Sequence, residues 1–175
     1  MASDRRDALM PDKLSNPRDL FLTLLSEALY VERRLAADIL PTLHEQASDE
    51  ELEEALAEHL EQTRAHVERV GSAFRAVRAE PAARRSPPLE ALASEHEELA
   101  GSVVLPSLRD GVHAAAAAHG EHYEIAAYGA LLPLARALAA SEAIDALEQN
   151  LRDEEKALRK LEKIVDRLVH EATLP

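Results

Sequence analysis

A chain of 175 residues suits one domain, and 46% apolar against 3% aromatic residues predicts a core of Leu, Val, Ile and Ala. The net charge of −13 argues against binding to nucleic acid or anionic membrane, and the lack of cysteine excludes disulfides, thiolate catalysis and Cys-based metal sites. No signal peptide and no long uncharged apolar run are visible, so a cytoplasmic protein is expected.

The first long helix is predicted to begin at Asn16 and Pro17, which suit the N-cap and the first helical position. Residues 1–15 show no periodicity and are expected to form a mobile N-terminal tail. Apolar residues recur at helical spacing from this start to Leu43. Pro41 lies inside that pattern and is expected to kink or shorten the helix.

A second long helix is predicted from Ser48 and Asp49 to Val77, antiparallel to the first because the connection between them is short. The Pro-rich sequence EPAARRSPP then interrupts the periodicity. A short helix is expected at 89–99, inside a crossover that spans about 80–104.

Two more long helices are predicted, one from about 105 to 139 with a bend at Pro133 and one capped by Ser141. Two helix pairs joined by one long crossover have ferritin-like connectivity. The sequence therefore predicts an all-α protein: a ferritin-like antiparallel four-helix bundle with one long crossover carrying a short extra helix. Residues 16–172 are expected to form this single domain.

Polar side chains interrupt three of the apolar stripes. Thr63, Glu121 and Glu154 each lie between apolar residues one turn before and one turn after them. A carboxylate in an apolar seam is costly unless it is paired or bound to metal. Glu121 and Glu154, near the middle of two helices, are therefore expected to have partners.

Other acidic and imidazole side chains fall near the same faces. Bundle di-iron and di-manganese sites take a Glu from each of two helices and Glu-x-x-His from each of the other two. Carboxylate and imidazole ligands suit iron and manganese. We predict an iron or manganese site, which is dinuclear if these ligands suffice for two ions. His59 is interpreted as a core histidine and Asp153 as part of a solvated face. The predicted ligands are Glu32, His66, Glu121, Glu124 and Glu154.

Neither Glu-x-x-His motif is complete. When the last helix is aligned with the second by their leucines, Thr63 corresponds to Glu154 and His66 to Ala157. The second helix therefore has the His without the Glu, and the last helix has the Glu without the His. Two hypotheses stay open. The first is a metal-binding protein that oxidises Fe(II) or disposes of peroxide. The second is a structural or interaction protein on a ferritin-like scaffold with a degenerate, empty metal site, whose buried carboxylates form a hydrogen-bonded network.

Four segments of the sequence resemble the YciE/YciF family of ferritin-like stress proteins: LFLTLLSEALYVERRL, EHLEQTRAHVERV, HGEHYEIAAYGALLPLA and LRDEEKALRKL. The most specific of them contains the run from His122 to Gly129. The resemblance covers roughly residues 17–170. It implies a bundle related to rubrerythrin and manganese catalase, a homodimer, and a link to bacterial stress responses.

The segment from Gly120 to Glu124 is also similar to the third-helix ligand segment of rubrerythrins. This similarity implies that Glu121 is a ligand and Glu124 an alternate ligand, with Glu32 at the matching place on the first helix. Rubrerythrins carry Glu where this chain has Thr63, and they have a rubredoxin-type Cys domain that this chain lacks. Rubrerythrin-type peroxidase chemistry is therefore not implied.

Overall fold

The computed structural model describes residues 13–173, and every regular element in that range is helical. Residues 1–12 lie outside it, so most of the predicted mobile tail falls outside the described residues. None of the described helices is long and apolar enough to cross a membrane. The elements in chain order are α1 (Pro17–Arg34), the π-helical turn η1 (Leu35–Ile39), α2 (Leu40–Gln46), α3 (Glu50–Ala76), α4 (Pro87–Ser102), the 3-10 turn η2 (Pro106–Leu108), α5 (Arg109–Ala137) and α6 (Ser141–Ala172).

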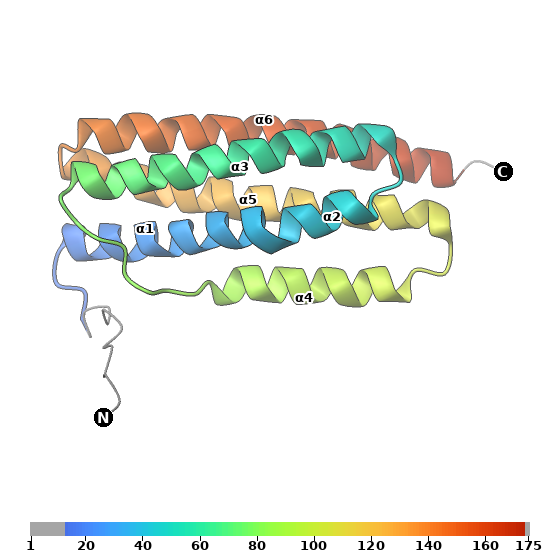
Figure 1. The fold of residues 1–175 in the computed structure, drawn as a ribbon, viewed down its shortest axis with the longest axis horizontal. Coiled ribbons are helices and arrows are strands. Elements are labelled where there is room, and N and C mark those ends of the chain that lie inside the picture. Colours follow the sequence, from blue (N-terminus) through green and yellow to red (C-terminus); the bar gives the residue numbers. More distant parts are fainter. Residues whose placement is uncertain (1–12, 174–175) are drawn as a thin grey trace, which may run out of the picture.

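Four rods lie side by side in Figure 1: α1 continued by α2, then α3, α5 and α6. Contacts join α1 to α3 and α5, and α6 to the same two helices. Each rod is antiparallel to both neighbours, because the crossover carries the chain back along the bundle before α5 begins. Helix α4 lies on the outside of the bundle and packs against α5. This arrangement confirms the predicted four-helix bundle with its extra helix in the crossover.

Side-chain caps set most of the predicted helix starts. Asn16 accepts a hydrogen bond from the backbone N–H of Asp19, and Asp49 accepts one from Leu52, both at 3.0 Å. The predicted cap of the last helix was wrong, because Ser141 is already helical. Ala140 takes the capping position, where its backbone oxygen accepts from the N–H of Ile144.

The helix in the crossover is longer than expected, since it begins at Pro87 instead of residue 89. Ser86 caps it by accepting from the backbone N–H of Leu89. The helix also ends later than expected, at Ser102 instead of residue 99, with Gly101 in its last turn. The following helix continues through Pro133 to its end.

The interruption predicted at Pro41 occurs, but it lies just before the proline. Proline has no N–H to donate, and its ring crowds the carbonyl four residues earlier. The chain widens into η1, where the N–H of Leu40 reaches back five residues to the oxygen of Leu35. Pro41 then occupies the first turn of α2, a position that tolerates it.

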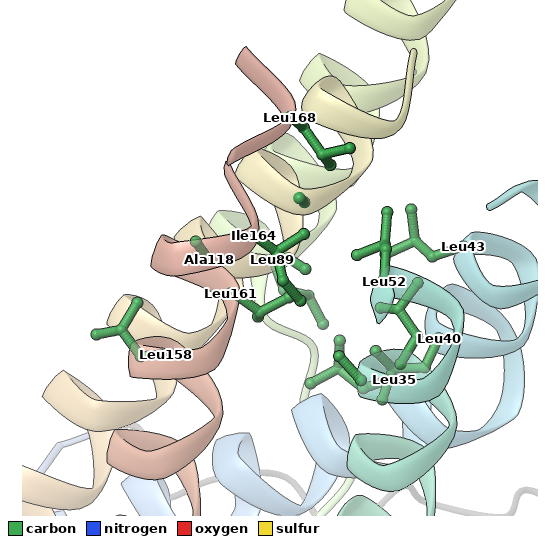
Figure 2. Close-up of a cluster of buried hydrophobic side chains, with 14 of the residues drawn as sticks. Leu35, Leu40, Leu43, Leu52, Leu89, Ala118, Leu158, Leu161, Ile164 and Leu168 are labelled. Atoms are coloured by element: carbon green, nitrogen blue, oxygen red, sulfur yellow. The ribbon is translucent and has the colours of Figure 1, made fainter. Parts of the chain in front are cut away.

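Two apolar clusters fill the bundle, one toward each end. The α2-end core, shown in Figure 2, joins α2, the first half of α3, Leu89 of α4, and parts of α5 and α6. The α1-start core contains Phe21, Phe74, Tyr128 and Leu147. Along each of α3, α5 and α6, buried polar residues separate the stretch that joins one core from the stretch that joins the other. A polar layer therefore crosses the middle of the bundle.

Candidate metal centre

Six ionisable side chains from four helices form this polar layer. None of them exposes more than 5% of its surface. The two on α3 are two turns apart and the two on α5 are one turn apart, so each pair shares the inward face of its helix. They are Glu32 on α1, His59 and His66 on α3, Glu121 and Glu124 on α5, and Glu154 on α6.

These side chains divide into two groups with the spacing of metal ligands. The first group is His59, Glu121, Glu124 and Glu154, and the second is Glu32, His66 and Glu154. Within each group, one ligand atom from every residue lies within 4.8 Å of the others. Glu154 belongs to both groups, so its carboxylate is placed to bridge two adjacent ions.

The histidines of α3 stand between the carboxylates of the other helices. His66 Nδ1 lies 2.8 Å from Glu154 Oε1 and 3.4 Å from Glu32 Oε2. His59 Nε2 lies 3.1 Å from Glu121 Oε1. Each imidazole therefore points a ring nitrogen into the space that the carboxylate oxygens surround.

Many atoms of the polar layer lack a hydrogen-bond partner, although they are shielded from solvent. His66 Nδ1 and Glu154 Oε1 are among them, because they are close without being aligned for a hydrogen bond. Folded proteins leave few such groups, and each costs about 1–3 kcal/mol. A bound cation would satisfy them together. The unpartnered atoms are Glu32 Oε2, His59 Nδ1, His66 Nδ1, Glu121 Oε2, Glu124 Oε1 and both carboxylate oxygens of Glu154.

Burial changes the acidity of the carboxyl groups on α1 and α5. It raises the pKa of Glu121 and Glu124 well above the ordinary value, and the charge of Glu154 adds to the effect. Burial also raises the pKa of Glu32. Burial therefore makes these carboxyl groups easier to protonate than exposed ones, so ions that bind there compete with protons.

The pKa values of His66, Glu154 and His59 depend on burial and on the charges of one another. Burial opposes the charged form of His66, but the carboxylates of Glu154 and Glu32 outweigh it and raise its pKa to about 10. Burial likewise opposes ionised Glu154, but His66 and His59 outweigh it and lower the pKa of that carboxyl. For His59 burial prevails and lowers the pKa, which favours the neutral imidazole that metals require.

An outer layer of hydrogen bonds orients His66. Its Nε2 lies 3.4 Å from Asp153 Oδ2, and Arg69 donates to the same oxygen at 2.8 Å. A carboxylate on the far nitrogen of a histidine is a common support for metal ligands. Asp153, predicted to belong to a solvated face, therefore contacts the polar layer from outside.

A second outer chain supports Glu32. The hydroxyl of Tyr128 donates to Glu32 Oε1 and accepts from Asn150 Nδ2, which lies 2.8 Å away. Arg69 donates to Asn150 Oδ1 and so joins this chain to Asp153. The support runs through α1, α3, α5 and α6, so it couples the rotations of all four helices.

Tyr128→Phe is expected to destabilise the protein by about 1–3 kcal/mol, because it leaves Glu32 Oε1 and Asn150 Nδ2 buried without their partner. Urea unfolding followed by circular dichroism measures this loss. Tyr123→Phe serves as the control, since its hydroxyl bonds Ser86 and Glu27 in a half-buried position. An equal or larger loss in the control would contradict the assignment.

All five predicted ligands lie in the polar layer, and His59, interpreted as a core histidine, lies there beside them. His59 and His66 are seven residues apart, two helical turns, so they share a face of α3. Thr63 lies between them and donates its hydroxyl to the backbone oxygen of His59. The layer thus holds four carboxylates and two imidazoles, which is the ligand inventory of a complete bundle di-metal site. Thr63 and Ala157, where the motif comparison found ligands missing, do not reduce that inventory.

Known proteins share both the sequence and the fold. The model of a family described as "Domain of unknown function (DUF892)" matches residues 16–174. Protein YciF of Escherichia coli strain K12 is 35% identical over 140 residues, which cover 79% of this chain and 83% of that protein.

Solved structures agree with this match. The crystal structure of the E. coli stress protein YciF superposes with a TM-score of 0.84 at 30% identity, covering 90% of this chain and 99% of that one. YcfI from Rhodopseudomonas palustris superposes with a TM-score of 0.83 at 31% identity, covering 88% and 98%. The sequence resemblance noted above is thereby confirmed.

Proposed function

The chain belongs to the DUF892 family, together with the stress protein YciF, and we propose that it binds two iron or manganese ions at mid-bundle as part of a stress response. One observation carries the proposal: seven buried nitrogen and oxygen atoms, drawn from all six side chains of the polar layer, lack a hydrogen-bond partner. Their cost to the metal-free fold is explained if ions are what the site is built to hold.

The mixture of ligands favours iron or manganese over other common metals. Calcium and magnesium prefer all-oxygen sites, and zinc sites commonly have four ligands rich in Cys or His. Four carboxylates and two imidazoles, with Glu154 shared, suit a pair of Fe or Mn ions.

The side chains have separable roles in this proposal. Glu154 would contribute to both ions, Glu32 and His66 would complete the ligands of one, and His59, Glu121 and Glu124 would hold the other. Tyr128 and Asp153 fix the directions of Glu32 and His66. When bound, the ions would supply the redox capacity for oxidising Fe(II) or disposing of peroxide.

Metal analysis of protein purified without chelator tests the proposal. We expect about two iron or manganese ions per chain, matching the two ligand groups. Glu121→Ala is expected to lose metal, whereas Glu155→Ala, which changes an exposed neighbour of the site on α6, retains it. Absence of metal from every preparation, including iron-reconstituted protein, would refute the proposal.

The second candidate is a structural or interaction protein with an empty site. The incomplete Glu-x-x-His motifs favour it. In that case the polar layer would act as a specificity device that fixes helix register. Fe(II) would then leave the melting temperature unchanged, whereas the first proposal requires a rise.

A further inference from the structure

A cavity of about 750 Å³ lies beside the polar layer, between η1 and α2, α4, and the first half of α5. It is partly open to solvent at a rim that includes Asp38, Glu97 and Arg109. Its inner end reaches His59, Glu121 and Glu124, the ligands proposed for one of the two ions. Its volume is within the range of pockets that bind small organic molecules.

Apolar atoms contribute the larger share of the cavity wall, and polar side chains supply the rest. Leu35, Leu40 and Leu43 line it from η1 and α2, and Leu89 and Leu92 line it from α4. This wall favours an aliphatic body over a sugar, nucleotide or other strongly polar molecule.

Small residues on α5 create the space. Ala116, Ala117 and Gly120 line the cavity between His113 and Glu121, and they belong to the Ala-rich start of α5. A Cβ added to Gly120 would meet no atom within 4 Å. Bulkier side chains at these positions would project where the cavity now lies.

A buried imidazole supplies an unmet polar contact on the cavity wall. His113 is 1% exposed and lines the cavity, and its Nε2 has no hydrogen-bond partner. Its Nδ1 lies 2.8 Å from Nε2 of His96, which lines the same cavity. Glu121 Oε2 and Glu124 Oε1 are also without partners at the inner end. The cavity thus combines an apolar wall with one unpartnered imidazole nitrogen, and unpartnered carboxylate oxygens lie at its inner end.

We propose that this cavity binds a neutral aliphatic molecule whose head group carries an O–H, an alcohol or an alkyl hydroperoxide, with the head beside His113. An O–H can both donate and accept, so it can pair with the unpartnered Nε2 of His113 in either tautomer of the imidazole. A carboxylate head group would enter a cavity that Glu121 and Glu124 also line, in a protein of net charge −13. An ammonium would compete with the proposed metal ions for the same oxygens. The choice of a neutral head therefore rests on the proposed metal-binding function.

Calorimetric titration of chelator-treated protein with octanol, octyl hydroperoxide and octanoate tests the assignment without depending on metal or turnover. We expect saturable binding of the neutral ligands and weaker binding of octanoate, and the tighter of the two neutral ligands identifies the preferred head. Gly120→Leu fills the cavity and should weaken binding of the neutral ligands by about tenfold or more. Gly129→Leu is the matched control, because it adds the same side chain to an exposed position of the same helix and should bind like the wild type.

Three results would overturn the proposal: no saturable binding of either neutral ligand, unchanged binding in Gly120→Leu with a helical circular dichroism spectrum, or tighter binding of octanoate. Metal content measured on the same wild-type preparation separates this proposal from the previous one. Metal without ligand binding refutes the cavity assignment alone. Binding of octanol by protein that never holds metal supports the cavity and refutes the metal proposal.

Discussion

Glu154→Leu is expected to abolish the stabilisation of the protein by iron or manganese. Glu154 is the one residue in both ligand groups, so its loss removes a ligand from each ion. A metal present at a hundred times its Kd stabilises a folded protein by about 2.7 kcal/mol. For a domain of this size that corresponds to a rise of about 5 to 11 °C in Tm. Differential scanning fluorimetry with and without anaerobic Fe(II) measures the difference.

The metal-free form of Glu154→Leu is expected to melt below the wild type at neutral pH. The substitution relieves repulsion on Glu121 and Glu124, but it leaves His66 without the carboxylate 2.8 Å from its Nδ1. Removing one partner of a buried charge pair costs more than the repulsion that it relieves. Glu155→Leu alters the adjacent exposed position and should keep the full metal-dependent rise. A rise of equal size in Glu154→Leu would mean that the ions bind elsewhere.

The metal-free protein is expected to lose stability steadily as pH rises from about 7, where His59, His96 and His113 are already neutral in both states, to about 10. Glu121 and Glu124 have a raised pKa in the folded state, so their contribution is present below the ordinary carboxyl pKa and is lost as pH rises through the raised one. For His66 the contribution is complete below pH 6.5 and is lost as pH rises to about 10. The folded protein holds more protons than the unfolded chain in both windows, so the free energy of unfolding falls.

The loss from His66 alone is on the order of a few kcal/mol, since its pKa moves from 6.5 to about 10. Thermal melts of chelator-treated protein across this pH range measure the slope. His66→Gln should flatten the profile above neutral pH, whereas His170→Gln, at an exposed position, should leave it unchanged. A Tm that increases between pH 7 and 9 would contradict the expectation. Metal-loaded protein should lack the decline, because the ions have already displaced these protons.

The fold could be predicted from the sequence because apolar residues recur at helical spacing in four long segments and one Pro-rich crossover joins the two pairs. The polar layer was visible where Glu121 and Glu154 interrupt those stripes. These inferences need only the local period of the helix. The π-helical turn could not be predicted. Pro41 indicates that the helix is interrupted, but it does not determine which turn of the helix widens.

His59 could not be distinguished from a core histidine by periodicity. Leu60 and His59 are adjacent, and a small rotation of α3 decides which of them faces the centre. The structure buries His59 and leaves Leu60 half-buried. Asp153 was missed for a related reason, since its contacts are with Arg69 and His66, more than 80 residues away along the chain. Such pairings depend on how the helices pack, which a single stripe does not encode.

The widened turn η1 sets the direction in which the side chains of α2 face, relative to those of α1. In a regular α-helix, two residues five apart point about 140° away from each other. Leu35 and Leu40 are five apart, yet both are buried in the α2-end core, because η1 spreads one turn over the extra residue. Removing one residue from η1 would keep Glu32 at the polar layer and rotate Leu40 and Leu43 out of the core and off the cavity wall. The turn changes the angle at which the following residues face the bundle, so one rod contributes both to the polar layer and to the wall of the cavity, which would otherwise need different rotations of the helix.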